Sequence, residues 1–123
     1  MTASVITEGI MVHPITAADL AELVHSQVVD LVDVRDLSEW DAGHIDGARL
    51  VPLDQFRADP DAALVRGSVI VFICAKGVRS LAAAKLAERF GYDRVYNLEG
   101  GTKEWARVGY PLVVSTDSGR VAA

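Results

Sequence analysis

The sequence of 123 residues contains a single cysteine, so it cannot form an internal disulfide or a metal site built from several cysteines. Its three histidines, His13, His25 and His44, are scattered, and no metal-binding cluster is predicted from them. A lone cysteine fits a reducing compartment best, and we therefore expect a cytoplasmic protein.

Long apolar runs and an excess of positive charge are also missing. The longest wholly apolar run, residues 69–75, is far shorter than the roughly 20 residues that span a bilayer. The N-terminus lacks the basic start and apolar stretch of a secretory signal. The formal net charge is −5, from 12 basic and 17 acidic residues, so we expect no membrane and no nucleic-acid partner.

What is present indicates one globular domain, since half of the residues are apolar and 24% are charged. Runs of β-branched and apolar residues alternate with helical patterns. The predicted strands are residues 28–33, 49–51, 68–74 and 94–98, and the predicted helices are a segment after the N-cap Thr16, residues 54–64 with a break at Pro60, residues 79–90 and residues 102–108. This alternation is typical of an α/β domain with a mostly parallel sheet.

Apolar spacing also predicts which helical side chains are buried. Leu20 and Val24 belong to the predicted buried stripe of the first helix, and Ala83 and Phe90 to that of the helix at 79–90. Ser38 is expected to cap a short helical turn that ends at residue 43.

The most informative segment is residues 74–80, where a buried strand ends at Cys74 and a helix follows. Backbone N–H groups of such a loop, together with the helix N-terminus, favour the reactive thiolate. Lys76 and Arg79 add positive charge, so we predict a lowered pKa for this thiol. A free cysteine within a strand would otherwise be an inert core residue, but its position before Gly77 and two cations favours a functional thiol.

Three blocks of the sequence resemble the rhodanese family over about residues 16–112. They are residues 33–35 with 39–40, 43–45 and 47–48; the loop 74–80; and residues 98–101 with Trp105 and 109–111. The resemblance implies a rhodanese-like fold at 16–112, with a central, mostly parallel five-stranded sheet flanked by helices on both faces. Residues 1–15 would be an N-terminal extension with the first strand, and residues 113–123 a flexible tail.

The resemblance further implies a sulfurtransferase that works through a persulfide on Cys74. Thiosulfate, a persulfide or a polysulfide would donate the sulfur, and cyanide in an assay or a thiol in the cell would accept it. A partner protein could carry the donor persulfide; no cofactor or metal is implied, and the protein is expected to be a monomer or homodimer. Beside the catalytic Cys74, the resemblance assigns donor binding to Ala75, Lys76, Gly77, Val78, Arg79 and Ser80, and support to Asp33, Arg35 and Glu39.

The roles of the supporting residues can be interpreted in more than one way. Asp33 and Arg35 either brace the loop or form an ordinary structural ion pair, and both interpretations stay open. Two-domain thiosulfate enzymes of the family carry an arginine where this chain has Glu39, while Lys76 matches their lysine. A carboxylate near the site would repel a dianion, which predicts that thiosulfate is only an assay substrate.

Other functions fit these residues less well. Phosphatases with a similar loop place five residues between cysteine and arginine, whereas four separate Cys74 from Arg79, and Ile73 replaces their preceding histidine. A non-catalytic binding module on the same fold and a thiol oxidation sensor remain as alternatives. His44 is interpreted as a turn residue rather than a base, and Gly100 and Gly101 as a backbone turn.

Overall fold

A parallel sheet of five strands forms the centre of the molecule. The computed structural model describes residues 12–114. The strands are β1 (His13–Ile15), β2 (Asp30–Asp33), β3 (Arg49–Leu50), β4 (Ile70–Ile73) and β5 (Val95–Leu98). They lie in the order β1-β5-β4-β2-β3, and every neighbouring pair is parallel. The predicted α/β class and parallel sheet are confirmed.

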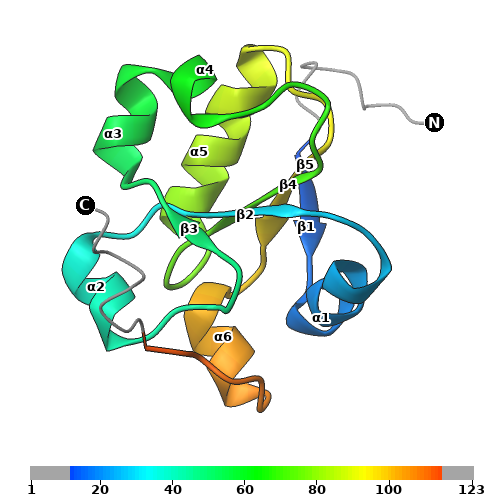
Figure 1. Cartoon of the computed structure of the whole chain (residues 1–123), viewed down its shortest axis with the longest axis vertical. Helices are drawn as coiled ribbons and strands as arrows, with labels where there is room; N and C mark the ends of the chain where they lie inside the picture. Colours follow the sequence, from blue (N-terminus) through cyan, green and yellow to red (C-terminus); the bar gives the residue numbers. More distant parts are fainter. Residues whose placement is uncertain (1–11, 115–123) are drawn as a thin grey trace.

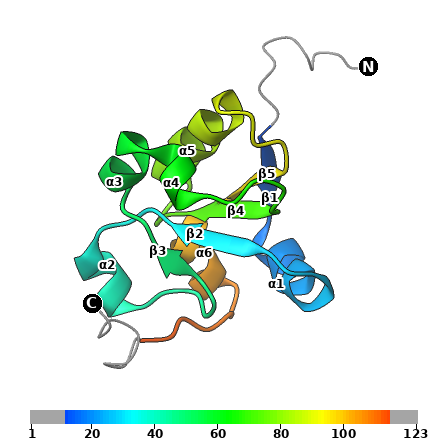
Figure 2. The same cartoon turned by 45° about the horizontal axis from the view of Figure 1, so that its top comes forward.

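Helices cover both faces of this sheet (Figures 1 and 2). They are α1 (Ala17–Ser26), α2 (Leu37–Ala42), α3 (Leu53–Ala58), α4 (Pro60–Ala63), α5 (Val78–Arg89) and α6 (Gly101–Arg107). The expected break at Pro60 separates α3 from α4, because the proline ring fits the first turn of a new helix, which Asp59 caps. None of the helices within residues 12–114 is long and apolar enough to cross a membrane.

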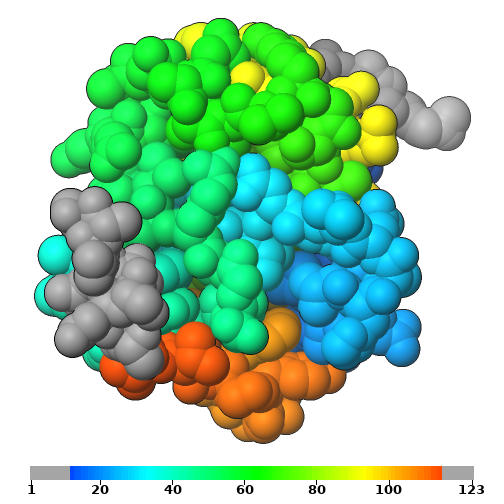
Figure 3. Space-filling model, in the orientation of Figure 1, coloured from blue at the N-terminus to red at the C-terminus, as the bar shows by residue number. Residues whose placement is uncertain are grey.

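Two apolar cores lie on opposite sides of β4, which is buried along its whole length. Ile70 and Phe72 pack toward α3, α4 and α5, whereas Val71 and Ile73 pack toward α1 and α6. The alternation follows from the twofold side-chain period of a strand and explains why this segment is apolar on both faces. In the space-filling view, the green segment from α3 to α5 covers the upper part, and α1 and α6 lie below it (Figure 3).

The cap of α2 differs from the prediction. Asp36, not Ser38, is the N-cap: its carboxylate accepts the Glu39 N–H at 2.9 Å, and the Glu39 carboxylate accepts the Asp36 N–H at 3.2 Å. Ser38 instead donates its hydroxyl hydrogen to Asp36 at 2.8 Å. The reciprocal pair satisfies two backbone donors at once, which a serine two residues further along cannot do.

The predicted apolar stripes are wrong at their C-terminal ends. Val24 is 39% exposed and Phe90 is 42% exposed, whereas Leu20 and Ala83 are fully buried. Val24 lies in the last turns of α1, and Phe90 is the C-cap of α5, so both extend past the part of their helix that contacts the sheet. The predicted N-cap Thr16 is confirmed, since its hydroxyl accepts the Asp19 N–H at 3.1 Å.

The structure describes only part of the predicted N-terminal extension and C-terminal tail. Residues 1–11 of the expected extension and residues 115–123 of the expected tail lie outside the described residues. Val113, assigned to that tail, pairs with His44 through two backbone hydrogen bonds of 2.9 and 2.8 Å.

Candidate active site

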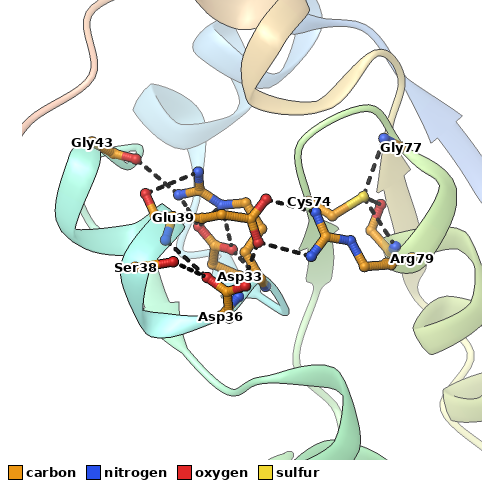
Figure 4. Close-up of polar contacts among 10 residues, drawn as sticks. Asp33, Asp36, Ser38, Glu39, Gly43, Cys74, Gly77 and Arg79 are labelled. Atoms are coloured by element: carbon orange, nitrogen blue, oxygen red, sulfur yellow. Dashed lines mark hydrogen bonds and ion pairs between the residues drawn. The ribbon is translucent and has the colours of Figure 1, made fainter.

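The carboxyl ends of the parallel strands meet at one edge of the sheet, and the predicted site lies there. β4 ends just before Cys74, and the loop 74–77 leads directly into α5. β2 ends next to it, because the Val34 N–H donates to the Ile73 carbonyl at 2.9 Å. Residues 33–39 and 74–80, far apart in the sequence, therefore lie side by side (Figure 4).

Three polar groups of the loop and helix surround the Cys74 sulfur. The Gly77 N–H lies 3.1 Å from Sγ, the Ser80 N–H 3.3 Å and the Ser80 hydroxyl 3.2 Å. Cys74 is only 1% exposed, as a core residue would be, but these backbone N–H groups face its sulfur. Such a ring of donors stabilises negative charge on the atom that it surrounds.

The pKa of the Cys74 thiol is lowered, in the predicted direction. Burial alone raises it, because surroundings of low dielectric disfavour the thiolate. Hydrogen bonds from the Ser80 hydroxyl and from the N–H groups of Ser80, Lys76 and Gly77 together lower this pKa by more. The loop N–H groups and the charges of Lys76 and Arg79 both predict this lowering, and in the structure hydrogen bonds are the leading favourable cause.

The first turn of α6 fixes the opposite side of the loop. The Thr102 N–H donates to the Cys74 carbonyl at 2.9 Å, and the Lys103 N–H donates to the Ala75 carbonyl at 3.0 Å. With the Ala75 carbonyl turned toward α6, the N–H of the same peptide unit, that of Lys76, contributes a hydrogen bond to the thiol. Gly101 makes this approach possible: a β-carbon there would lie 2.3 Å from the Cys74 carbonyl oxygen, and its φ of +61° also favours glycine.

Arg79 and Glu39 form a bidentate ion pair between α5 and α2 (Figure 4). The two nitrogen–oxygen distances are both 2.8 Å. The Arg79 hydrogen bond is the largest cause that brings the pKa of Glu39 from 4.5 to about 2, and Glu39 in turn raises the pKa of Arg79. The sequence places Arg79 and Glu39 in separate roles, whereas in the structure the Glu39 carboxylate pairs with the Arg79 guanidinium and compensates its charge.

Asp33 and Arg35 form a second ion pair, deeper in the protein. Their side chains are 0% and 6% exposed, and the Arg35 Nη2 lies 2.8 Å from the Asp33 carboxylate. Arg35 also donates to the carbonyls of Gly43, at 2.9 Å, and of Glu39, at 3.3 Å. The pair therefore braces α2, which carries Glu39, and Glu39 in turn contacts Arg79 of α5.

The remaining loop residues line its outer side. Lys76 is exposed, Val78 is 75% exposed and Ala75 is half-buried. A hollow of about 230 Å³ beside Arg79 is lined by Val34, Arg35, Asp36, Pro52, Leu53 and Asp54.

A larger hollow, of about 770 Å³, lies at the opposite edge of the sheet. Its lining includes Asp30, Ser68 and Arg94, which stand at or just before the starts of β2, β4 and β5. The length of the strands separates it from Cys74, so its size does not make it the catalytic site.

His44 and the two tryptophans have packing roles. The His44 ring stacks on Trp40 with centroids 3.6 Å apart, and its Nδ1 lies 3.0 Å from the Trp40 carbonyl. Trp105 is a buried residue of α6, and its Nε1–H donates to the Pro111 carbonyl at 2.9 Å. These contacts agree with the interpretation of His44 as a structural residue.

Asn97 is the site residue that the sequence analysis missed. It is 7% exposed on β5, and its side chain contacts both the Ser80 hydroxyl and the Gly77 carbonyl. The available signal was one polar residue between apolar neighbours in a predicted strand. That pattern reveals an inward polar group but not its partners.

Comparison with known proteins agrees with this geometry. The model of the family described as "Rhodanese-like domain" matches residues 16–108. A rhodanese-related protein of Thermoplasma volcanium has a similar crystal structure, with a TM-score of 0.76 and 32% identity over 84% of this chain and 99% of that one.

Two curated relatives are larger proteins. The "Probable adenylyltransferase/sulfurtransferase MoeZ" of Mycobacterium tuberculosis is 35% identical over 81% of this chain and 26% of its own length. A "tRNA uridine(34) hydroxylase" of Erwinia tasmaniensis is 32% identical over 74% of this chain and 27% of its own length. The present chain thus spans about a quarter of each of these relatives. From the family match and the structural neighbour, the chain belongs to the rhodanese-like domain family.

Proposed function

We propose that the protein is a sulfurtransferase that carries a sulfane sulfur on Cys74. The observation that supports this most is the pair of backbone N–H groups that face Sγ, from Gly77 at 3.1 Å and from Ser80 at 3.3 Å. They stabilise a thiolate, which is the nucleophilic form of cysteine. The relative named as a sulfurtransferase favours the same chemistry.

The proposed reaction has two half-reactions and needs no external oxidant. The Cys74 thiolate attacks the outer sulfur of the donor, a new S–S bond forms, and the donor's bond to that sulfur breaks. The leaving group keeps the electron pair and departs as a thiolate, or as sulfite when thiosulfate is the donor. An acceptor thiolate or cyanide then attacks the outer sulfur, and Cys74 leaves as a thiolate.

The charges at the site favour a persulfide or polysulfide over thiosulfate as the natural donor. Arg79 is neutralised by Glu39 at 2.8 Å, so a dianion gains little attraction from this guanidinium. Lys76 is exposed on the loop and supplies one positive charge. Thiosulfate carries both negative charges on one small ion, whereas a persulfide carries one on its sulfurs and a polysulfide spreads two along its chain, so both match this balance better.

Intact mass spectrometry after exposure to thiosulfate, glutathione persulfide and inorganic polysulfide tests the proposal. We expect the mass of one sulfur atom to be added to the wild-type protein, fastest with the persulfide or polysulfide, and removed again by cyanide as thiocyanate. Cys74→Ala is the control and should gain nothing. Equal thiocyanate production by wild type and Cys74→Ala, or no gain from any donor, would reject the proposal.

A further inference from the structure

A buried amide lies behind the Cys74 sulfur and links two parts of its surroundings. Asn97 on β5 is 7% exposed. Its Nδ2 donates to the Gly77 carbonyl at 3.1 Å, and its Oδ1 lies 2.5 Å from the Ser80 hydroxyl oxygen. The same hydroxyl oxygen lies 3.2 Å from Cys74 Sγ. One hydroxyl therefore stands between two acceptors.

The orientation of the Asn97 amide follows from its partners. The Gly77 carbonyl can only accept a hydrogen bond, so the NH₂ group must face it and Oδ1 must face Ser80. Oδ1 can only accept as well, and its short distance to the Ser80 oxygen requires a hydrogen between them. Ser80 has only one hydroxyl hydrogen, so its hydrogen bonds to Sγ and to Oδ1 compete, and the shorter distance, 2.5 Å against 3.2 Å, favours Asn97.

We propose that Asn97 is a positioning residue that restrains ionisation of Cys74 by holding the hydroxyl hydrogen of Ser80. In the neutral thiol, S–H donates to the Ser80 oxygen, and Ser80 donates to Asn97, so every group is satisfied. In the thiolate, Sγ would be stabilised by a hydrogen bond from the Ser80 hydroxyl, but Asn97 already accepts that hydrogen bond. If Ser80 turns toward the sulfur, two oxygens 2.5 Å apart face each other with no hydrogen between them.

The restraint has a consequence that rests on the proposed function. Once Cys74 carries the extra sulfur, the negative charge lies on the outer sulfur instead of on Sγ. The Ser80 hydroxyl can then continue to donate its hydrogen bond to Asn97. Asn97 therefore disfavours the free thiolate without disfavouring the persulfide. Asn97 thereby favours the ionised Cys74 persulfide over the free Cys74 thiolate.

The pH dependence of iodoacetamide alkylation measures this restraint, and it does so whether or not the protein transfers sulfur. Cys74 is the only cysteine, so the rate of labelling reports its ionisation alone. In Asn97→Leu, the Ser80 hydrogen is free to turn to the thiolate. We expect the thiol pKa to fall by about one unit, or tenfold more thiolate at a pH below it.

The charged groups near Cys74 remain the same in these variants. They are Lys76 and Arg79 on the loop and α5, Glu39 on α2, the Asp33–Arg35 pair at the end of β2 and Lys103 on α6. A difference between wild type and variant therefore reports the altered hydrogen bonds. Thermal unfolding checks that each variant is folded, and Asn97→Ala, which removes the same oxygen with a smaller side chain, carries the same expectation.

Asn97→Leu removes the contact with the Ser80 hydroxyl and also the contact with the Gly77 carbonyl. A double-mutant cycle with Ser80→Ala separates the effects of these two losses on the thiol pKa. Asn97→Leu should lower the thiol pKa when Ser80 is present and should not lower it when Ser80 is replaced by alanine. An unchanged or raised pKa in folded Asn97→Leu and Asn97→Ala would overturn the proposal. An equal fall with and without the Ser80 hydroxyl would also overturn it, because Asn97 would then act through Gly77.

Discussion

Two ion pairs near Cys74 use the same chemistry in different surroundings. The Asp33–Arg35 pair is almost completely buried, whereas the Glu39 and Arg79 side chains are 30% and 39% exposed. Water screens the outer pair, so it contributes little to stability and is free to orient a loop. The inner pair has no such screening, and each of its members depends on the other. Depth in the protein therefore separates a structural role from a positioning role.

The largest expected effect comes from breaking the inner pair. Asp33→Ala leaves the buried Arg35 charge without its partner, and we expect the free energy of unfolding to fall by about 3–5 kcal/mol, with activity lost in parallel. Urea unfolding measures the change. Asp30→Ala is the matched control, because it breaks the more exposed Arg49–Asp30 pair and should change stability by no more than about 1 kcal/mol. Loss of turnover at unchanged stability in Asp33→Ala would contradict the structural role.

A smaller effect is expected from Arg35→Lys. Lysine keeps the positive charge beside Asp33 but loses the planar fork that also reaches the carbonyls of Gly43 and Glu39. We expect a loss of about 1.5–3 kcal/mol by urea unfolding, the range for hydrogen bonds to a charged group. Stability equal to that of wild type would show that charge alone braces α2.

The outer pair should affect donor choice more than stability. Glu39→Gln removes the negative charge from Arg79, so loading from thiosulfate should accelerate by up to about fivefold, the equivalent of about 1 kcal/mol. Loading from glutathione persulfide, measured by the same mass assay, should change less. A parallel loss with both donors would indicate that Glu39 positions the loop without selecting the donor.

The smallest effect is a pH dependence of the outer pair. The pKa of Glu39 is lowered from 4.5 to about 2, so the folded state favours its carboxylate. Its contribution to stability is therefore complete above about pH 4.5 and is lost as the pH falls toward 2. We expect the difference in melting temperature between wild type and Glu39→Gln to shrink across this range. A difference that stays constant down to pH 2 would show that the carboxylate charge is not its source.

The sequence allowed prediction of the fold because its strongest signals are local. The apolar run that became β4, the break at Pro60 and the cap at Thr16 each depend on neighbouring residues. The N-cap of α2 was placed at Ser38 instead of Asp36 because several residues with capping side chains lie close together there. The C-terminal ends of the apolar stripes failed at Val24 and Phe90, since periodicity does not show where a helix leaves the sheet.

The site could be predicted only where its residues are adjacent in the chain. Cys74 and the loop after it form one such segment, and the direction of the thiol pKa followed from it. The Glu39–Arg79 pair joins residues that are 40 positions apart, and Asn97 reaches Ser80 across 17. Such partners depend on strand order and helix placement, so single residues were identified without the contacts that define their roles.

The short connection from Trp105 to Val113 has a mechanical consequence. The α6 amides hold the loop carbonyls, Trp105 is bonded to Pro111, and Val113 pairs with His44, which stacks on Trp40 of α2. From α2 the path returns to the loop through Glu39 and Arg79. Cys74 thus lies inside a closed ring of contacts that joins α6, α2 and α5 around the loop, so the loop is held from two directions.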